Sequence, residues 1–208
     1  MRKADSDGVI VRDDPKNVPS DEELIARFQK GDTYAFDQLV RRYKDPLLNF
    51  VYRFISDLVE AEDVVQETFY RVFKNKHYYK EVAKFSTWIY TIAGNLAKTE
   101  LRRRRRRKVF SIHKDSHEKD IDLPDEKSDP EKKVNTALTE KIIEKAIRNL
   151  PEKFRQVIIL RDVQEFSYEE ISSILKVPLG TVKSRVNRAR LRLQEDLSFL
   201  IDDMNTQL

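Results

Sequence analysis

The chain has 208 residues, of which 37% are charged, with a net charge of only +4 and no cysteine. The lack of cysteine excludes disulfides and thiolate metal sites, and the small net charge means that the placement of the charges is more informative than their sum. No apolar run reaches the roughly 20 residues of a membrane span and no signal peptide opens the chain, so we expect a soluble, cytoplasmic protein.

The first half of the chain predicts a series of helices with apolar faces. Residues 1–19 are polar and are expected to be a disordered tail. Ser20 followed by three acids predicts a helix start, and Gly31 ends that helix. Further helices are expected over about residues 33–55, 58–73 and 86–107. Pro46 is expected to bend or split the second helix, residues 74–85 to be irregular, and no strand is evident.

The predicted helix over residues 58–73 has an acidic face. Val64 and Val65 turn inward, while Asp63, Gln66 and Glu67 share a face at helical spacing. Because acids repel DNA, this face favours contact with a basic protein partner. A solvated helix surface is the alternative interpretation.

The predicted helix over residues 86–107 carries a different polar face. Its members recur at spacings of three and four: Trp88, Thr91, Asn95, Lys98 and Arg102. An aromatic ring, an amide and two cations suit melted nucleic acid, because bases stack on rings and cations hold phosphates. Phe85, just before this helix, could add a stacking surface. The alternative is that Phe85 and Trp88 are ordinary core residues.

Six consecutive arginines and a lysine, residues 102–108, form the densest charge in the chain. Such runs bind nucleic acid nonspecifically, so phosphate anchoring is the simpler interpretation. A frayed, solvated helix end is the alternative.

The composition changes after this run. Residues 111–129 contain three lysines and seven acidic residues with little apolar content, and they predict a flexible linker between two helical domains. Asp129 followed by Pro130 is a helix-start pattern that begins the second domain. The pair His113 and His117 lies within this polar segment and is not expected to bind a metal.

The second domain predicts helices over about residues 130–149, 151–163, 167–175 and 178–203, the last two forming a helix-turn-helix. Ser167 and Glu170 have the spacing of a capping box. Val182 and Val186 mark an apolar back on the last helix, with Pro178 expected in its first turn. Opposite that back lie Lys183, Ser184, Asn187 and Arg188. Such side chains can read base edges in a major groove, whereas a solvated basic helix in an ordinary bundle is the alternative.

Three segments together resemble bacterial RNA polymerase sigma factors of the extracytoplasmic-function (ECF) branch. They are EDVVQETF at residues 62–69, FSTWIYTIAGN at residues 85–95 and GTVKSRVNRAR at residues 180–190. The resemblance covers about residues 21–200. Pro178 departs from it, because many members have Ser or Asp as the cap there. The arginine run is also denser than usual.

The resemblance implies an all-α fold of two small helical domains on a flexible acidic linker, the second ending in the helix-turn-helix. A region 2-like domain would span residues 20–108, the linker residues 109–129 and a region 4-like domain residues 130–205. Docking on the polymerase clamp helices would fall to Asp63, Gln66 and Glu67. Contact with the melted −10 element would fall to Phe85, Trp88, Thr91, Asn95, Lys98 and Arg102. In the −35 reader, Lys183, Ser184, Asn187 and Arg188 would face bases, with Thr181 and Arg185 nearer phosphate.

The expected function is therefore a dissociable subunit that directs core RNA polymerase to promoter DNA. No nucleophile–base pair, metal cluster or Gly-rich phosphate loop is evident, so we expect no enzyme activity, cofactor or small-molecule substrate. The resemblance also implies an anti-sigma partner. The alternatives are a stand-alone helix-turn-helix regulator that binds operators as a dimer, and a helical adaptor or accessory of a nucleic-acid-dependent enzyme.

Overall fold

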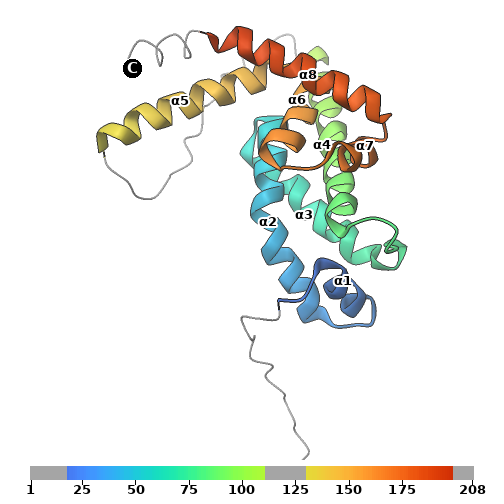
Figure 1. The fold of residues 1–208 in the computed structure, drawn as a ribbon. Coiled ribbons are helices and arrows are strands. Elements are labelled where there is room, and N and C mark those ends of the chain that lie inside the picture. Colours follow the sequence, from blue (N-terminus) through green and yellow to red (C-terminus); the bar gives the residue numbers. More distant parts are fainter. Residues whose placement is uncertain (1–17, 111–129, 199–208) are drawn as a thin grey trace, which may run out of the picture.

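The computed structural model describes residues 18–110 and 130–198, and all regular structure within them is helical, as predicted (Figure 1). The first unit consists of α1 (Asp21–Gln29), α2 (Thr33–Ile55), α3 (Leu58–Lys74), a 3-10 turn (Lys76–Tyr78) and α4 (Phe85–Phe110). The second consists of α5 (Pro130–Asn149), α6 (Glu152–Ile158), a π-helical turn (Ile159–Val163), α7 (Tyr168–Leu175) and α8 (Leu179–Asp196). Most of the predicted tail, most of the predicted linker and the pair His113 and His117 lie outside the described residues.

Local sequence signals set the helix starts. The Ser20 hydroxyl accepts from the Glu23 backbone N–H at 3.1 Å, and the Glu23 carboxylate accepts from the Ser20 N–H at 2.7 Å. The predicted start of α1 at Ser20 is confirmed, and it has both hydrogen bonds of a capping box. Gly31, with a φ of 107°, provides the left-handed backbone that ends this segment.

Pro46 does not split α2, which is one uninterrupted helix. The proline removes one backbone donor, but buried side chains on both sides of it, Tyr43, Leu47 and Phe50, hold the helix on the core. Tertiary packing therefore outweighs the local helix-breaking tendency.

Two predicted helix ends were wrong. α4 continues to Phe110, beyond the expected end at residue 107, and several arginines of its last turns are paired with acids. α8 ends at Asp196 instead of about residue 203, with Leu197 as its C-cap. The π-helical turn after α6 was not predicted from the sequence.

The two units share one hydrophobic core in this structure, although the sequence suggests separate domains on a tether. The ring of Tyr90 on α4 lies 4.8 Å from that of Phe166, and its hydroxyl donates to the side-chain oxygen of Gln164. Gly94 allows close approach, because a Cβ there would meet the buried Gln156 amide at 3.3 Å. The second unit is thus packed against α4.

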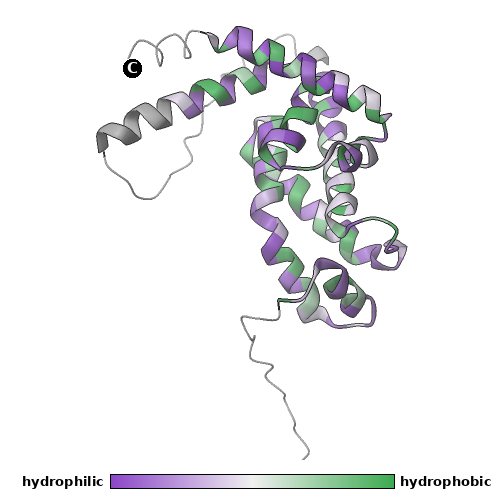
Figure 2. Cartoon of the chain, viewed as in Figure 1, coloured by the Kyte–Doolittle hydropathy of each residue, from purple (hydrophilic) through white to green (hydrophobic). Residues whose placement is uncertain are grey.

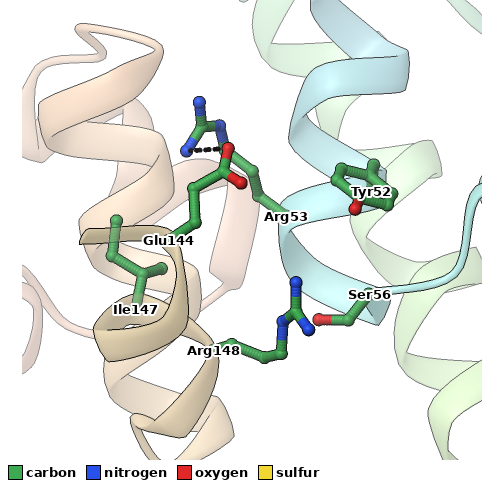
Figure 3. A pocket seen from close by; sticks show the side chains of 6 residues that line it. All are labelled: Tyr52, Arg53, Ser56, Glu144, Ile147 and Arg148. Carbon is green, nitrogen blue, oxygen red and sulfur yellow. Dashed lines mark ion pairs between the residues drawn. The ribbon is translucent and has the colours of Figure 1, made fainter. Parts of the chain in front are cut away.

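Polar contacts surround this shared core. Arg155 donates to the Phe54 carbonyl at 2.9 Å and to the Leu150 carbonyl at 3.2 Å, so it joins the C-terminal ends of α2 and α5. In Figure 3, Arg53 of α2 pairs with Glu144 of α5 at 3.2 Å. Cations at helix C-termini are favoured by the helix dipole, which supports the contacts of Arg155.

None of the helices in the described residues has the length and apolarity needed to cross a membrane.

Candidate nucleic-acid interface

The helix-turn-helix is formed by α7, a tight turn and α8. Ser167 caps α7, and the Glu170 carboxylate accepts a hydrogen bond from the Ser167 N–H at 2.8 Å. Together these contacts form the predicted capping box. Lys176 takes the left-handed conformation that turns the chain. Pro178 is the residue just before α8 and makes no side-chain cap, so helical residues begin at Leu179. The expectation of Pro178 within the first turn is off by one position.

α8 has an apolar back and an exposed polar front, and hydrophilic and hydrophobic residues alternate along it (Figure 2). Val182, Val186 and Ala189 are buried. The exposed front consists of Lys183, Ser184, Asn187 and Arg188. Thr181 and Arg185 are partly buried at its border. The four side chains that were expected to face bases are all open to solvent in this structure.

The other two arginines of α8 are engaged within the protein. Arg190 donates through two of its nitrogens to Asp162, and this bond raises the pKa of the Arg190 guanidinium. The Arg192 guanidinium lies 5.2 Å from the centre of the Phe154 ring. The five cations of this helix are therefore not equivalent.

The second predicted face, on α4, is only partly accessible. Asn95 and Arg102 are exposed, whereas Trp88, Thr91 and Lys98 are partly buried. The Trp88 ring packs 5.4 Å from Tyr79 and 6.0 Å from Phe85. The two faces expected to bind DNA thus differ in exposure.

Phe85 is a core residue, with 0% of its surface exposed and ring contacts to Tyr43, Tyr79 and Trp88. It is not available for base stacking in this structure, and the core alternative applies to it. The sequence did contain a signal for this, because Phe85 lies four residues before Ile89 and so continues the buried face of α4. Tyr78, three residues after Asn75 in the preceding segment, is 80% exposed instead.

Lys98 lies where the two units meet. Burial lowers the pKa of the Lys98 amine. The negative charge of Glu152 on α6 raises this pKa, whereas the positive charges of Arg102 and Arg185 lower it further. One side of the α4 face is therefore close to both the second unit and a residue of α8.

The acidic face of α3 is present as expected. Asp63 and Gln66 are exposed, and Glu67 is partly buried and pairs with Arg71 at 2.8 Å. Exposed apolar residues flank it, namely Val59, Tyr70 and Phe73. Val59 and Phe73 were not predicted, although Val59 lies four residues before Asp63 and so continues the same helical face.

The arginines of the run 102–107 differ in their partners within the protein. Arg104, Arg105 and Arg107 form ion pairs with acids elsewhere in the protein. Arg102 and Arg106 are exposed and form no ion pair within the described residues. Among those residues there is also no cluster of His, Asp or Glu that could hold a metal ion.

Comparison with known proteins identifies the family. Residues 39–107 match Sigma-70 region 2, and residues 140–193 match Sigma-70, region 4. The ECF RNA polymerase sigma-E factor of Escherichia coli K12 is 36% identical over 186 residues, which cover 88% of this chain and 96% of that protein. The chain belongs to the ECF family of RNA polymerase sigma factors. As a sigma factor it is not an enzyme: it binds core RNA polymerase and directs initiation at promoter DNA.

Other relatives agree over nearly their whole length. The RNA polymerase sigma-H factor of Pseudomonas aeruginosa is 36% identical over 185 residues, covering 87% of this chain and 95% of that protein. The sigma factor RpoE from Bartonella quintana, solved in complex with the anti-sigma factor NepR, matches with a TM-score of 0.65 and 29% identity. That match covers 78% of this chain and 96% of RpoE. CnrH, solved with the cytosolic domain of CnrY, shares the fold, with a TM-score of 0.62 and 22% identity over 89% of this chain and 99% of CnrH.

Proposed function

We propose that this sigma factor divides its work among three faces: α8 reads the −35 element as duplex, α4 holds the −10 element as unpaired strand, and α3 binds core polymerase. The observation that carries this division is the coexistence of an acidic face on α3 with basic faces on α4 and α8. A stand-alone regulator has no use for the acidic face, since it would repel DNA.

On α8, the exposed front supplies the base contacts. Lys183 and Arg188 can donate to guanine, and Asn187 can pair with adenine through two bonds. Thr181 and Arg185, at the border of that front, are placed for phosphate, and Ser184 can reach either. The buried back holds the helix in a fixed orientation against α6 and α7.

On α4, the exposed Asn95 amide is the strongest candidate for reading an unpaired base edge. Lys98 and Arg102 then hold phosphate, with Thr91 and Trp88 alongside. Because Phe85 is buried, the exposed ring of Tyr78 is the better candidate for stacking from the preceding segment.

On α3, Asp63, Gln66 and Glu67 provide charge complementarity to a basic coiled coil of the polymerase. The exposed Tyr70 beside them adds an aromatic anchor, which is a residue type enriched at interface centres. The predicted region 2-like domain, residues 20–108, thereby combines polymerase and −10 contacts, and residues 130–205 form the −35 reader.

The partners of this chain follow from the same roles. We expect it to work in the cytoplasm, where bacterial polymerase and promoters are found, and to be held by an anti-sigma factor. RpoE of Bartonella quintana was solved with such a partner. The shared core of the two units gives an inhibitor a closed conformation to stabilise.

The polymerase assignment is tested by reversing charge on α3. Asp63→Lys with Glu67→Lys should weaken core binding in gel filtration by several kcal/mol, because like charges would meet at the interface. The matched control reverses two exposed acids at the end of α8, Glu195→Lys with Asp196→Lys, which changes net charge equally. Equal core affinity in both double variants would contradict the assignment of α3.

A further inference from the structure

The corner between α2 and α3 determines how the proposed polymerase-binding helix leaves the core. Only two residues separate the helices. Ser56 takes a left-handed conformation, with a φ of 61°, and Asp57 is extended. The Asp57 side chain caps α3 by accepting from the Glu60 N–H at 3.1 Å. The direction of α3 therefore depends on this short segment.

One guanidinium from α4 spans the corner. Arg104 donates to the carbonyl of Ile55, the last residue of α2, at 3.1 Å, and to the Asp57 carboxylate, the cap of α3, at 3.2 Å. Its Nε lies 3.7 Å from the carboxylate of Glu60 in the first turn of α3. Arginine reaches the three sites through three separate nitrogens in a rigid, planar fork, whereas all donors of a lysine ammonium lie on one nitrogen.

Arg107, one turn further along α4, also contacts this corner. It lies 3.4 Å from the other oxygen of Glu60 and 2.8 Å from Glu100 on its own helix. Burial raises the pKa of the Glu60 carboxyl, and Arg104 and Arg107 oppose that rise. Without these arginines the half-buried carboxylate would lose its compensating charge.

Helical periodicity places the arginines of the run on different sides of α4. Arg104 and Arg107 lie three positions apart on the side that faces the corner, whereas Arg102 and Arg106 lie four positions apart on the opposite side and are exposed. Arg105 pairs with Glu152 of α6 at 3.0 Å. The run therefore contains residues with different surroundings, although the sequence shows only a block of like charge.

We propose that Arg104 is a positioning residue for polymerase binding: by clasping the α2–α3 corner it fixes the direction in which α3 presents Asp63 and Gln66. The inference rests on the proposed role of α3. In this arrangement the exposed Arg106 contributes nonspecific DNA affinity, and Arg104 contributes little of it.

The test compares Arg104→Gln with Arg106→Gln, which remove the same charge from the same helix. Both variants are assayed under conditions in which circular dichroism shows the full helical signal of the native chain. Arg104→Gln should weaken core polymerase affinity about tenfold or more and leave the salt dependence of nonspecific DNA binding unchanged. Arg106→Gln should lower that salt slope by about one and leave core affinity unchanged. The reverse pattern would make Arg104 a phosphate contact and overturn the proposal.

Two further variants separate positioning from general stability. Arg104→Lys keeps the charge but cannot span the corner, so it too should bind core polymerase weakly; full affinity would overturn the proposal. In the Asp63→Lys, Glu67→Lys background, Arg104→Gln should have little further effect, because the face it positions is gone. An equal additional loss would show that Arg104 acts on the whole fold. If the acid reversals themselves leave core affinity intact, the proposed role of α3 fails first.

Discussion

Arg188 and Arg190 lie two positions apart on α8, yet only Arg188 is free to meet DNA, since Arg190 is held by Asp162. Arg188→Ala should therefore relax the −35 preference at one or two positions, at a cost of about 1–3 kcal/mol. Arg190→Ala should leave the preference intact. A randomised −35 library, selected with each variant, measures both.

If the −35 sequence preference stays unchanged when Lys183, Asn187 and Arg188 are all replaced by alanine, α8 does not read bases.

Asn95 offers the cleanest test of −10 recognition, because it is exposed while Trp88 packs against Tyr79 and Phe85. Asn95→Ala should lower open-complex formation and leave −35 duplex binding unchanged, since an edge contact acts on an unpaired base. Permanganate footprinting measures the melted strand. A template with a pre-melted −10 bubble should not restore the loss; full rescue would assign Asn95 to melting and not to base capture.

The sequence predicted individual side chains well where a helical face decides their exposure, as at Lys183 and Asn187. It could not predict which cations are engaged, because the partner is set by the fold. Arg190 meets Asp162, 28 residues away, and Arg104 meets Asp57, 47 residues away.

At the scale of single elements, helix starts follow from local hydrogen bonds and were predictable, as the capping boxes at Ser20 and Ser167 show. The π-helical turn after α6 and the intact α2 around Pro46 depend on packing with distant residues, which periodicity does not report.

The capping box of α7 should contribute measurably to stability. Ser167→Ala removes the acceptor for the Glu170 N–H and should lower the free energy of unfolding by about 1 kcal/mol. Urea denaturation followed by circular dichroism measures the change. Ser173→Ala, on the exposed side of the same helix, is the control. A loss no larger than that of the control would contradict a stabilising cap.

Glu170 also makes α7 sensitive to acid. Burial of the Glu170 carboxyl raises its pKa, but hydrogen bonds from Lys84 and Ser167 outweigh this and hold the pKa below its ordinary value. A lowered folded-state pKa adds stability that is complete above the unfolded value of about 4.3 and disappears as pH falls through the folded value. The stability difference between the native chain and Glu170→Gln should therefore shrink below about pH 4. A difference independent of pH would contradict this role.

At the scale of the whole molecule, the shared core was the feature that sequence reasoning missed. Tyr90 and Phe166 each fit the apolar pattern of their own unit, so periodicity gives no sign that they pack on each other. The acidic segment between the units suggested independent domains, but it does not determine whether the domains touch.

Because the −35 and −10 elements lie about 25 base pairs apart, on the order of 80 Å, the packed units must separate to bind both. The native chain has no cysteine, so Lys84→Cys with Glu170→Cys introduces one unique pair of thiols where the ends of the native side chains lie 2.8 Å apart. A thiol-reactive crosslinker with a reducible disulfide spacer joins the shorter cysteine side chains. The crosslinked, locked protein should lose promoter-specific transcription, and a reductant that cleaves the spacer should restore it. Each single cysteine variant is the control. Normal initiation by the locked form would contradict the need for opening.

The central claim is that this chain directs core RNA polymerase to promoters through two separate DNA contacts. The most direct measurement is to sequence the transcripts that core polymerase makes in vitro on fragmented genomic DNA, with and without this protein. We predict discrete, protein-dependent start sites that share two upstream sequence elements, the upstream one altered by Arg188→Ala and the downstream one weakened by Asn95→Ala. Transcripts that do not depend on the protein, or start sites that share no such pair of elements, would contradict the claim.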